Sequence, residues 1–160
     1  MVSNLPYNIA VPLVVEMLEG VPAVESFLVM VQREVGERLA AGPGEDAYGA
    51  VSVRVAYRAE AALVRRVPPS VFWPRPKVES VLVRLDRRAH PPVDVDAERL
   101  FRVVDAGFAE RRKTLRNALR RLGLSAEAAA SALARCGLEP DARAETLSLE
   151  GFARLAGVVP

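Results

Sequence analysis

The sequence predicts an α/β fold that gives way to an all-helical C-terminal part, and two observations lead to this prediction. Residues 1–90 alternate between apolar runs of strand length and stretches with helical spacing. Residues 91–96 contain two prolines and are typical of a linker, and beyond them apolar residues recur only at helical spacing. We therefore expect the 160 residues to form two domains, 1–90 and 91–160.

The elements of the first domain follow from its hydrophobic pattern and its turn residues. Pro6 fixes the backbone of the opening segment, so residues 4–7 are predicted as a loop. Residues 47–58 fit either a helix or a strand, and we favour a helix. Prolines keep residues 71–76 extended. The remaining predictions are helices at 11–19 and 33–41 and strands at 25–32, 60–67 and 78–85.

The second domain shows helix periodicity with recognisable ends. Leu100, Val104 and Phe108 share one face of a helix over 97–110. The next helix, 114–122, has Thr114 as a predicted N-cap. Two more helices are predicted to begin at Ser125 and at Ser148. In a chain with only part of an α/β sheet, an unpaired edge and apolar faces are expected to be exposed.

The composition excludes several classes of protein. Apolar residues make up 51% and charged residues 26% of the chain, as in ordinary globular proteins. One cysteine and one histidine exclude a disulfide framework and a metal site built from several of these residues. No apolar run is long enough to span a membrane, and the N-terminus lacks the pattern of a secretory signal. We therefore expect a cytoplasmic protein with no metal and no membrane partner.

Positive charge is concentrated in one stretch of the chain. Residues 97–123 carry eight basic and three acidic residues, although the net charge of the whole chain is only +2. The densest block has no acid inside it and contains Arg111, Arg112, Lys113, Arg116, Arg120 and Arg121. Such a block suits a polyanion such as nucleic acid, although a solvated helix face is the alternative. Leu115 and Leu119 take the other face, so the basic stripe is free to meet phosphates.

The motif Asn4-Leu5-Pro6-Tyr7 combines groups that can hold a nucleobase. The Asn4 amide offers an acceptor and two donors, and the carbonyls of Leu5 and Pro6 can face a ligand. Tyr7 adds a flat aromatic surface for stacking. Two acceptors can hold an exocyclic amine and leave its lone pair available to attack an electrophilic methyl group. The alternative is an ordinary proline turn.

A second motif, Val71 to Val78, places aromatic residues on a proline-stiffened loop. Phe72 can present its ring to a base, while Arg75 and Lys77 can contact phosphates. The alternative is that Phe72 and Trp73 serve in packing, and we assign Trp73 no role.

Together these stretches resemble a known family. The stretches NLPYN (4–8), AGPGEDAYG (41–49), VFWPRPKVESVLVRL (71–85), FAERRKTLRNAL (108–119) and RAETLSLEGFARLA (143–156) are similar to the small-subunit ribosomal RNA adenine N6,N6-dimethyltransferases. The resemblance implies a Rossmann-like, S-adenosylmethionine-dependent methyltransferase domain followed by a small helical domain that binds the ribosomal subunit. The implied reaction dimethylates the N6 amine of two adjacent adenosines near the 3′ end of the small-subunit rRNA. The implied full-length enzyme is monomeric.

The resemblance also implies roles for individual residues. Asn4 would contact the cofactor and the target amine, the backbone of Leu5 and Pro6 would help accept the amine, and Tyr7 and Phe72 would sandwich the flipped adenine. The helix around Arg112 and Arg116 would meet RNA. The family's Gly-rich cofactor loop precedes its NLPY motif, so this chain resembles the C-terminal portion of the enzyme.

Two other functions remain open from the sequence. The basic block alone would suit a non-enzymatic RNA-binding module. The NLPY and Phe72 motifs also resemble large-subunit rRNA adenine methyltransferases of the antibiotic-resistance type. The RRKTLRNAL and RAETLS stretches favour the small-subunit enzymes.

Overall fold

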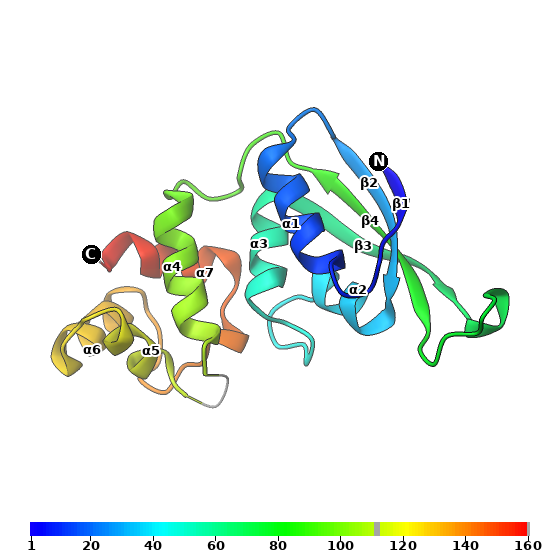
Figure 1. Ribbon diagram of the computed structural model, residues 1–160. Coiled ribbons are helices and arrows are strands. Elements are labelled where there is room, and N and C mark those ends of the chain that lie inside the picture. Colours follow the sequence, from blue (N-terminus) through cyan, green and yellow to red (C-terminus); the bar gives the residue numbers. More distant parts are fainter. Residues whose placement is uncertain (111–112, 160) are drawn as a thin grey trace. The chain divides into compact units, whose positions relative to one another are not determined.

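The computed structural model describes residues 1–110 and 113–159, and the chain divides into two compact units. The α/β unit comprises Met1–Ala41 and Arg54–Pro92, and the helical unit comprises Gly42–Val53 and Val93–Pro160. Figure 1 shows the sheet with helices in the first unit and only helices in the second. The predicted α/β fold followed by helices is confirmed.

The α/β unit contains a four-stranded mixed sheet. Its order is β1-β2-β4-β3, with β1 at Val2–Asn4, β2 at Ser26–Gln32, β3 at Ala59–Val67 and β4 at Ser80–Arg87. β1 runs parallel to β2, whereas β4 runs antiparallel to both β2 and β3. The strands predicted at 25–32, 60–67 and 78–85 are thus confirmed to within two residues.

Strand β1 corrects the sequence prediction, which placed Asn4 in a loop. Asn4 is the last residue of this strand and lies opposite Met30 of β2. Three residues are too few to show the alternation by which a strand is recognised. Pairing with β2, rather than local sequence, makes this segment a strand.

Three helices pack on one face of the sheet (Figure 1), namely α1 (Ala10–Gly20), α2 (Arg33–Ala40) and α3 (Ala50–Arg58). In α2, a Cβ atom added to Gly36 would lie only 2.3 Å from Cγ1 of Val81, so the helix approaches β4 as closely as its backbone allows. The Arg87 guanidinium donates hydrogen bonds to the carbonyls at the end of α1, including that of Leu18 at 2.6 Å. The helices predicted at 11–19 and 33–41 are confirmed, and the preference for a helix at 47–58 is correct from Ala50 onward.

The two faces of the sheet differ in burial. The face toward the helices carries buried side chains that alternate along β2 and β4: Phe27, Val29, Val31, Val81, Val83 and Leu85. The opposite face carries Leu28, Met30 and Leu82, which are only half-buried. The apolar core of the α/β unit therefore lies on one side of its sheet.

Strands β3 and β4 form a hairpin that extends from the sheet (Figure 1), and residues 63–79 at its end are called the hairpin arm. A 3₁₀ turn at Pro69–Val71 begins the connection between the two strands. This turn reaches one residue into the segment predicted to be extended, at Val71, and Phe72 is extended as expected. The connection is therefore shaped by its prolines.

The helical unit contains α4 (Ala97–Phe108), α5 (Leu115–Arg121), α6 (Ala126–Arg135) and α7 (Leu149–Val158). Its core is formed by the fully buried side chains of Leu100, Val104, Leu119, Leu133, Phe152 and Leu155. Ser125 and Ser148 cap α6 and α7 by accepting hydrogen bonds from the backbone amides of Ala128 and Gly151. Thr114 is the N-cap residue of α5, but its side chain makes no capping bond. The four predicted helices are confirmed.

Residues 42–53 pack within the helical unit, a contact that sequence reasoning did not anticipate. The Gly44 amide donates to the Glu145 carbonyl at 2.8 Å, and the Tyr48 hydroxyl donates to the Leu147 carbonyl at 2.7 Å. The Tyr48 ring meets Phe108 edge to face, with centroids 5.7 Å apart. Burial, with a smaller contribution from the Glu150 charge, raises the pKa of Tyr48 to about 12.

Candidate active-site pocket and basic face

Asn4 to Tyr7, called the corner, follow strand β1 directly. Because β1 and β2 are parallel, the corner lies at their carboxyl edge, where open α/β sheets bind ligands. The Leu5 amide donates to the Met30 carbonyl at 3.0 Å, and the Leu5 side chain is buried. Leu5 thus anchors the corner, while Asn4 and Pro6 remain exposed.

The corner offers hydrogen-bond acceptors that the described residues leave available. The Asn4 side chain makes no hydrogen bond within residues 1–110 and 113–159, and no donor from these residues reaches the Leu5 carbonyl. The Pro6 carbonyl, which the sequence also suggested as an acceptor, accepts the Ile9 amide at 3.2 Å. The geometry therefore favours Asn4 and Leu5 as the acceptor pair, because Pro6 is engaged in the turn that leads into α1.

Two aromatic rings from distant parts of the sequence accompany these acceptors. The hydroxyls of Tyr7 and Ser80 are hydrogen-bonded at 3.3 Å, which orients the Tyr7 ring while 39% of the residue stays exposed. Phe72 is half-buried, and its amide donates to the Pro69 carbonyl at 3.2 Å. Within the described part of the chain, the rings of Tyr7 and Phe72 do not touch each other.

The corner and the hairpin arm line one pocket of about 360 Å³. Its lining consists of Asn4, Leu5, Pro6, Tyr7, Phe72, Trp73, Pro74 and Pro76. The structure thus brings together the five residues that the sequence suggested for catalysis and base binding. A shallow pocket with two acceptors and three aromatic rings has the groups needed to hold a purine and its exocyclic amine.

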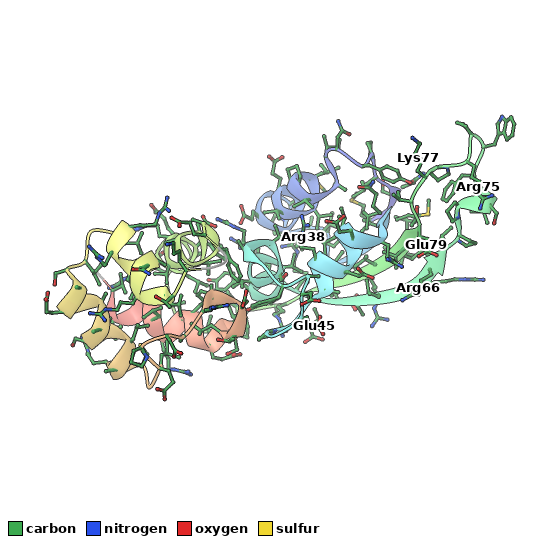
Figure 2. All side chains as sticks on the ribbon, turned by 90° about the horizontal axis from the view of Figure 1, so that it is seen from below. Arg38, Glu45, Arg66, Arg75, Lys77 and Glu79 are labelled. Atoms are coloured by element: carbon green, nitrogen blue, oxygen red, sulfur yellow. The ribbon has the colours of Figure 1, made fainter. Side chains whose placement is uncertain are left out.

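Arg75 and Lys77 flank this pocket on the hairpin arm. Figure 2 shows Arg75 toward the far end of the arm, with Lys77 and Arg66 closer to the rest of the sheet. Arg75 and Lys77 are exposed, and neither has an ion-pair partner among the described residues. They are therefore available to an anionic ligand.

The basic face comprises Lys113, Arg116, Arg120 and Arg121, on and just before α5. All four residues are exposed, while Leu115 and Leu119 on the other side of the helix are buried. Arg111 and Arg112 lie outside the described residues. The structure thus separates a charged side of α5 from an apolar side, as the spacing predicts.

Acidic residues beside the basic face modify its charge, a feature that sequence reasoning missed. Arg121 forms an ion pair with Glu110, eleven positions earlier in the chain. Hydrogen bonds from the backbone and from Ser125 lower the pKa of Glu127, and the nearby charges of Arg116 and Arg120 lower it further. Arg121 is paired with Glu110, and the Glu127 carboxylate lies near Arg116 and Arg120, so the net positive charge of this face is smaller than its four basic residues alone would give.

The described residues form neither a metal site built from His, Cys, Asp or Glu side chains nor a membrane-spanning helix. Among residues 1–110 and 113–159, no group of three or more His, Cys, Asp or Glu side chains is arranged to hold a metal ion. None of the helices formed by these residues has both the length and the apolar character needed to cross a membrane.

The chain is similar in sequence to known proteins over nearly its whole length. A family profile described as ribosomal RNA adenine dimethylase matches residues 1–159. The protein named ribosomal RNA small subunit methyltransferase A of Thermobifida fusca is 51% identical over 156 residues, which cover 98% of this chain and 54% of that protein. Its counterpart in Streptomyces coelicolor is 50% identical, with 98% and 55% covered. The chain thus spans about half the length of the curated relatives it matches.

Two solved structures share the fold. A dimethyladenosine transferase from Plasmodium falciparum superposes with a TM-score of 0.83 at 22% identity, over 96% of this chain and 64% of that one. The 23S rRNA methyltransferase ErmE superposes with a TM-score of 0.72 at 26% identity, over 99% of this chain and 64% of that one. The chain therefore shares its fold with these two proteins.

Proposed function

Because the chain belongs to the ribosomal RNA adenine dimethylase family, we propose that it provides the base-binding and rRNA-binding parts of an adenine N6,N6-dimethyltransferase. In this proposal residues 1–90 form the C-terminal half of the catalytic domain, and residues 91–160 bind the small ribosomal subunit. The substrate is small-subunit rRNA, with two adjacent adenosines near its 3′ end as targets. The single observation that carries the proposal is the pocket shared by the corner and Phe72.

The acceptor pair explains how the corner would prepare an adenine for methylation. The N6 amine has two N–H bonds, and the Asn4 side-chain oxygen and the Leu5 carbonyl can each accept one. With both N–H bonds held, the nitrogen lone pair is directed away from the acceptors and toward an incoming methyl group. S-adenosylmethionine, when bound, supplies that methyl group in electrophilic form.

Tyr7 and Phe72 would hold the ring of the same adenine. A base inside an RNA helix must be unstacked before its amine can be reached, which costs a few kcal/mol. Stacking on an aromatic side chain returns about 1–3 kcal/mol per base. Rings on two sides of the pocket can therefore stabilise the flipped base and restrict its orientation.

Asn4 is the one residue to which we assign a cofactor contact. Its amide is exposed, without a partner in the described chain, and lies at the carboxyl edge of β1 and β2. An amide has both donor and acceptor groups, so it can bind the target amine on one side and the methyl donor on the other. The chemistry of this residue therefore fits a position between the two reactants.

The basic face and the flanking residues Arg75 and Lys77 would bind the phosphates of the substrate. Phosphate contacts position a nucleic acid without reading its sequence. We assign RNA contacts to Lys113, Arg116, Arg120 and Arg121, and to Arg111 and Arg112 beside them. We further propose that the full-length enzyme acts as a monomer in the cytoplasm, where small subunits are assembled.

Large-subunit rRNA is the alternative substrate, because ErmE shares the fold. Its identity with this chain is 26%, against 51% for the small-subunit relative from Thermobifida fusca. This difference favours the small subunit.

The test is to fuse this chain behind the N-terminal part of the Thermobifida fusca relative and to express the fusion in cells that lack the corresponding methyltransferase. Mass spectrometry of rRNA fragments is expected to show N6,N6-dimethyladenosine near the 3′ end of the small-subunit rRNA. Modification of the large-subunit rRNA instead would support the alternative substrate. A folded fusion that bound RNA without methylating it would support a non-enzymatic module.

A further inference from the structure

Trp73 is almost wholly exposed, which is unusual for its residue type. It is the only tryptophan of the chain, and 98% of its surface is open to solvent. Tryptophan is highly buried on average, because its large apolar surface is costly to hydrate. Trp73 nevertheless lines the pocket that contains Asn4, Tyr7 and Phe72. The exposed Trp73 side chain therefore lies directly beside the proposed base-binding site.

We propose, on the basis of the function argued above, that Trp73 is a further stacking residue and binds the nucleotide next to the flipped adenosine. Trp73 would thus add affinity for a base beside the target adenosine. The indole offers a larger stacking surface than Phe72, and every base has a π-face that can stack on it.

The backbone explains why Trp73 would hold a different base from Phe72. Phe72 has extended backbone angles, φ −107° and ψ 148°. In an extended segment, successive side chains point to opposite sides of the backbone. Phe72 is half-buried on its side, while Trp73 projects into solvent. Two rings on opposite sides of the backbone are better suited to two consecutive nucleotides of one strand than to the two faces of one base.

The charge of the hairpin arm favours RNA as the occupant. Its four basic residues, Arg65, Arg66, Arg75 and Lys77, are all exposed. Glu79, the one acidic residue of the arm, is paired with Arg33 at 2.9 Å. The arm is thus positively charged along its length, with an aromatic ring near its end, the combination that binds single-stranded nucleic acid.

The experiment uses the single tryptophan as its own reporter in the 160-residue chain. The first probe is a fluorescently labelled six-nucleotide oligoadenylate, and the second is the same oligomer with every other base removed. The second probe keeps its phosphates and isolated adenines but has no base beside any adenine. Binding is measured by anisotropy of the label, and stacking is measured by quenching of Trp73 emission.

We expect the intact oligomer to quench Trp73 and to bind at least about fivefold more tightly than the abasic one. Trp73→Leu keeps an apolar side chain without an aromatic face, so the difference between the probes should disappear. Trp73→Phe should retain much of it. Matching thermal unfolding curves for the three proteins would show that folding is unaffected.

Other results would overturn the inference in distinguishable ways. If RNA binds and Phe72→Ala weakens it, but Trp73 is not quenched and Trp73→Leu binds normally, the proposed function stands and the role of Trp73 fails. If neither probe binds, both fail. If vesicles containing phosphatidylglycerol quench Trp73 and the intact oligomer does not, the arm binds membranes rather than RNA.

Discussion

In the proposed function, the pocket in the α/β unit and the basic face in the helical unit would offer an RNA strand two different kinds of contact. The pocket presents neutral groups: an amide, a backbone carbonyl and aromatic rings. The basic face presents guanidinium and ammonium groups with little aromatic surface. Base edges carry sequence information and phosphates do not, so in the proposed function selectivity would come from the pocket and salt-dependent affinity from the basic face.

Replacing Asn4 should have the largest effect. In the fusion described above, Asn4→Ala removes one of the two acceptors for the amine, and removal of one such positioned group typically costs about 10²–10³-fold in turnover. We expect methylation to fall by at least about 100-fold, while RNA affinity changes little. Asn8→Ala is the matched control, because Asn8 is also exposed but does not line the pocket. Equal activity of the two variants would contradict the amine-holding role.

Replacing Phe72 should affect binding of the base rather than its chemistry. Phe72→Ala removes one stacking surface, and we expect methylation at limiting RNA to fall by about 5- to 100-fold. Val71→Ala serves as the control, since Val71 is exposed on the same turn and lies outside the pocket lining. Competition with RNA that carries an abasic target site would show whether the loss requires a base. A uniform loss with both RNAs would assign Phe72 to packing.

The buried Tyr48 of the helical unit should make the free energy of unfolding depend on pH. Burial raises the pKa of Tyr48 to about 12 in the folded chain, whereas a tyrosine in an unfolded chain has a pKa near 10. Between these values the unfolded state binds fewer protons, so this contribution to the free energy of unfolding is complete below pH 10 and falls by about 2 kcal/mol as the pH rises. Denaturant unfolding at pH 9 and pH 11 should show the decrease in the parent chain and a smaller one in Tyr48→Phe.

The basic face should give the smallest effect at moderate salt. Replacing Arg116 and Arg120 by Gln should lower the slope of log affinity against log salt concentration by about two, because each phosphate contact contributes about one. Arg135→Gln is the control, since Arg135 is exposed on α6, outside the basic face. Filter binding across a salt series provides the measurement. An unchanged slope would mean that Arg116 and Arg120 face solvent in the complex.

The sequence predicted the elements whose hydrophobic pattern is long enough to be recognised. It did not predict features that depend on contacts between residues far apart in the chain. Helix α1 and strands β2 and β4 carry enough apolar residues for their periods to be recognised. Strand β1 has only three residues and depends on pairing with β2. Likewise, the pairing of Arg121 with Glu110 joins residues that no helix spacing relates.

The candidate site shows the same division. The resemblance to a family placed Tyr7 and Phe72 around one base, and the structure shows that they line one pocket. Their roles stay predictions. Local reasoning treated the Leu5 and Pro6 carbonyls as equivalent acceptors, because the Pro6 to Ile9 hydrogen bond depends on how the chain turns into α1.

The two segments that line the pocket, the corner and the hairpin arm, both connect to the end of strand β2. The Leu5 amide of the corner donates a hydrogen bond to the Met30 carbonyl. Ser80, the first residue of β4, is hydrogen-bonded to Tyr7 and lies opposite Gln32 in the sheet. The corner and the start of β4 are thus both paired with the same short stretch of β2, from Met30 to Gln32. Substitutions at the end of β2 are therefore a way to fit a bulkier purine analogue into the pocket while Asn4, Tyr7 and Phe72 stay unchanged.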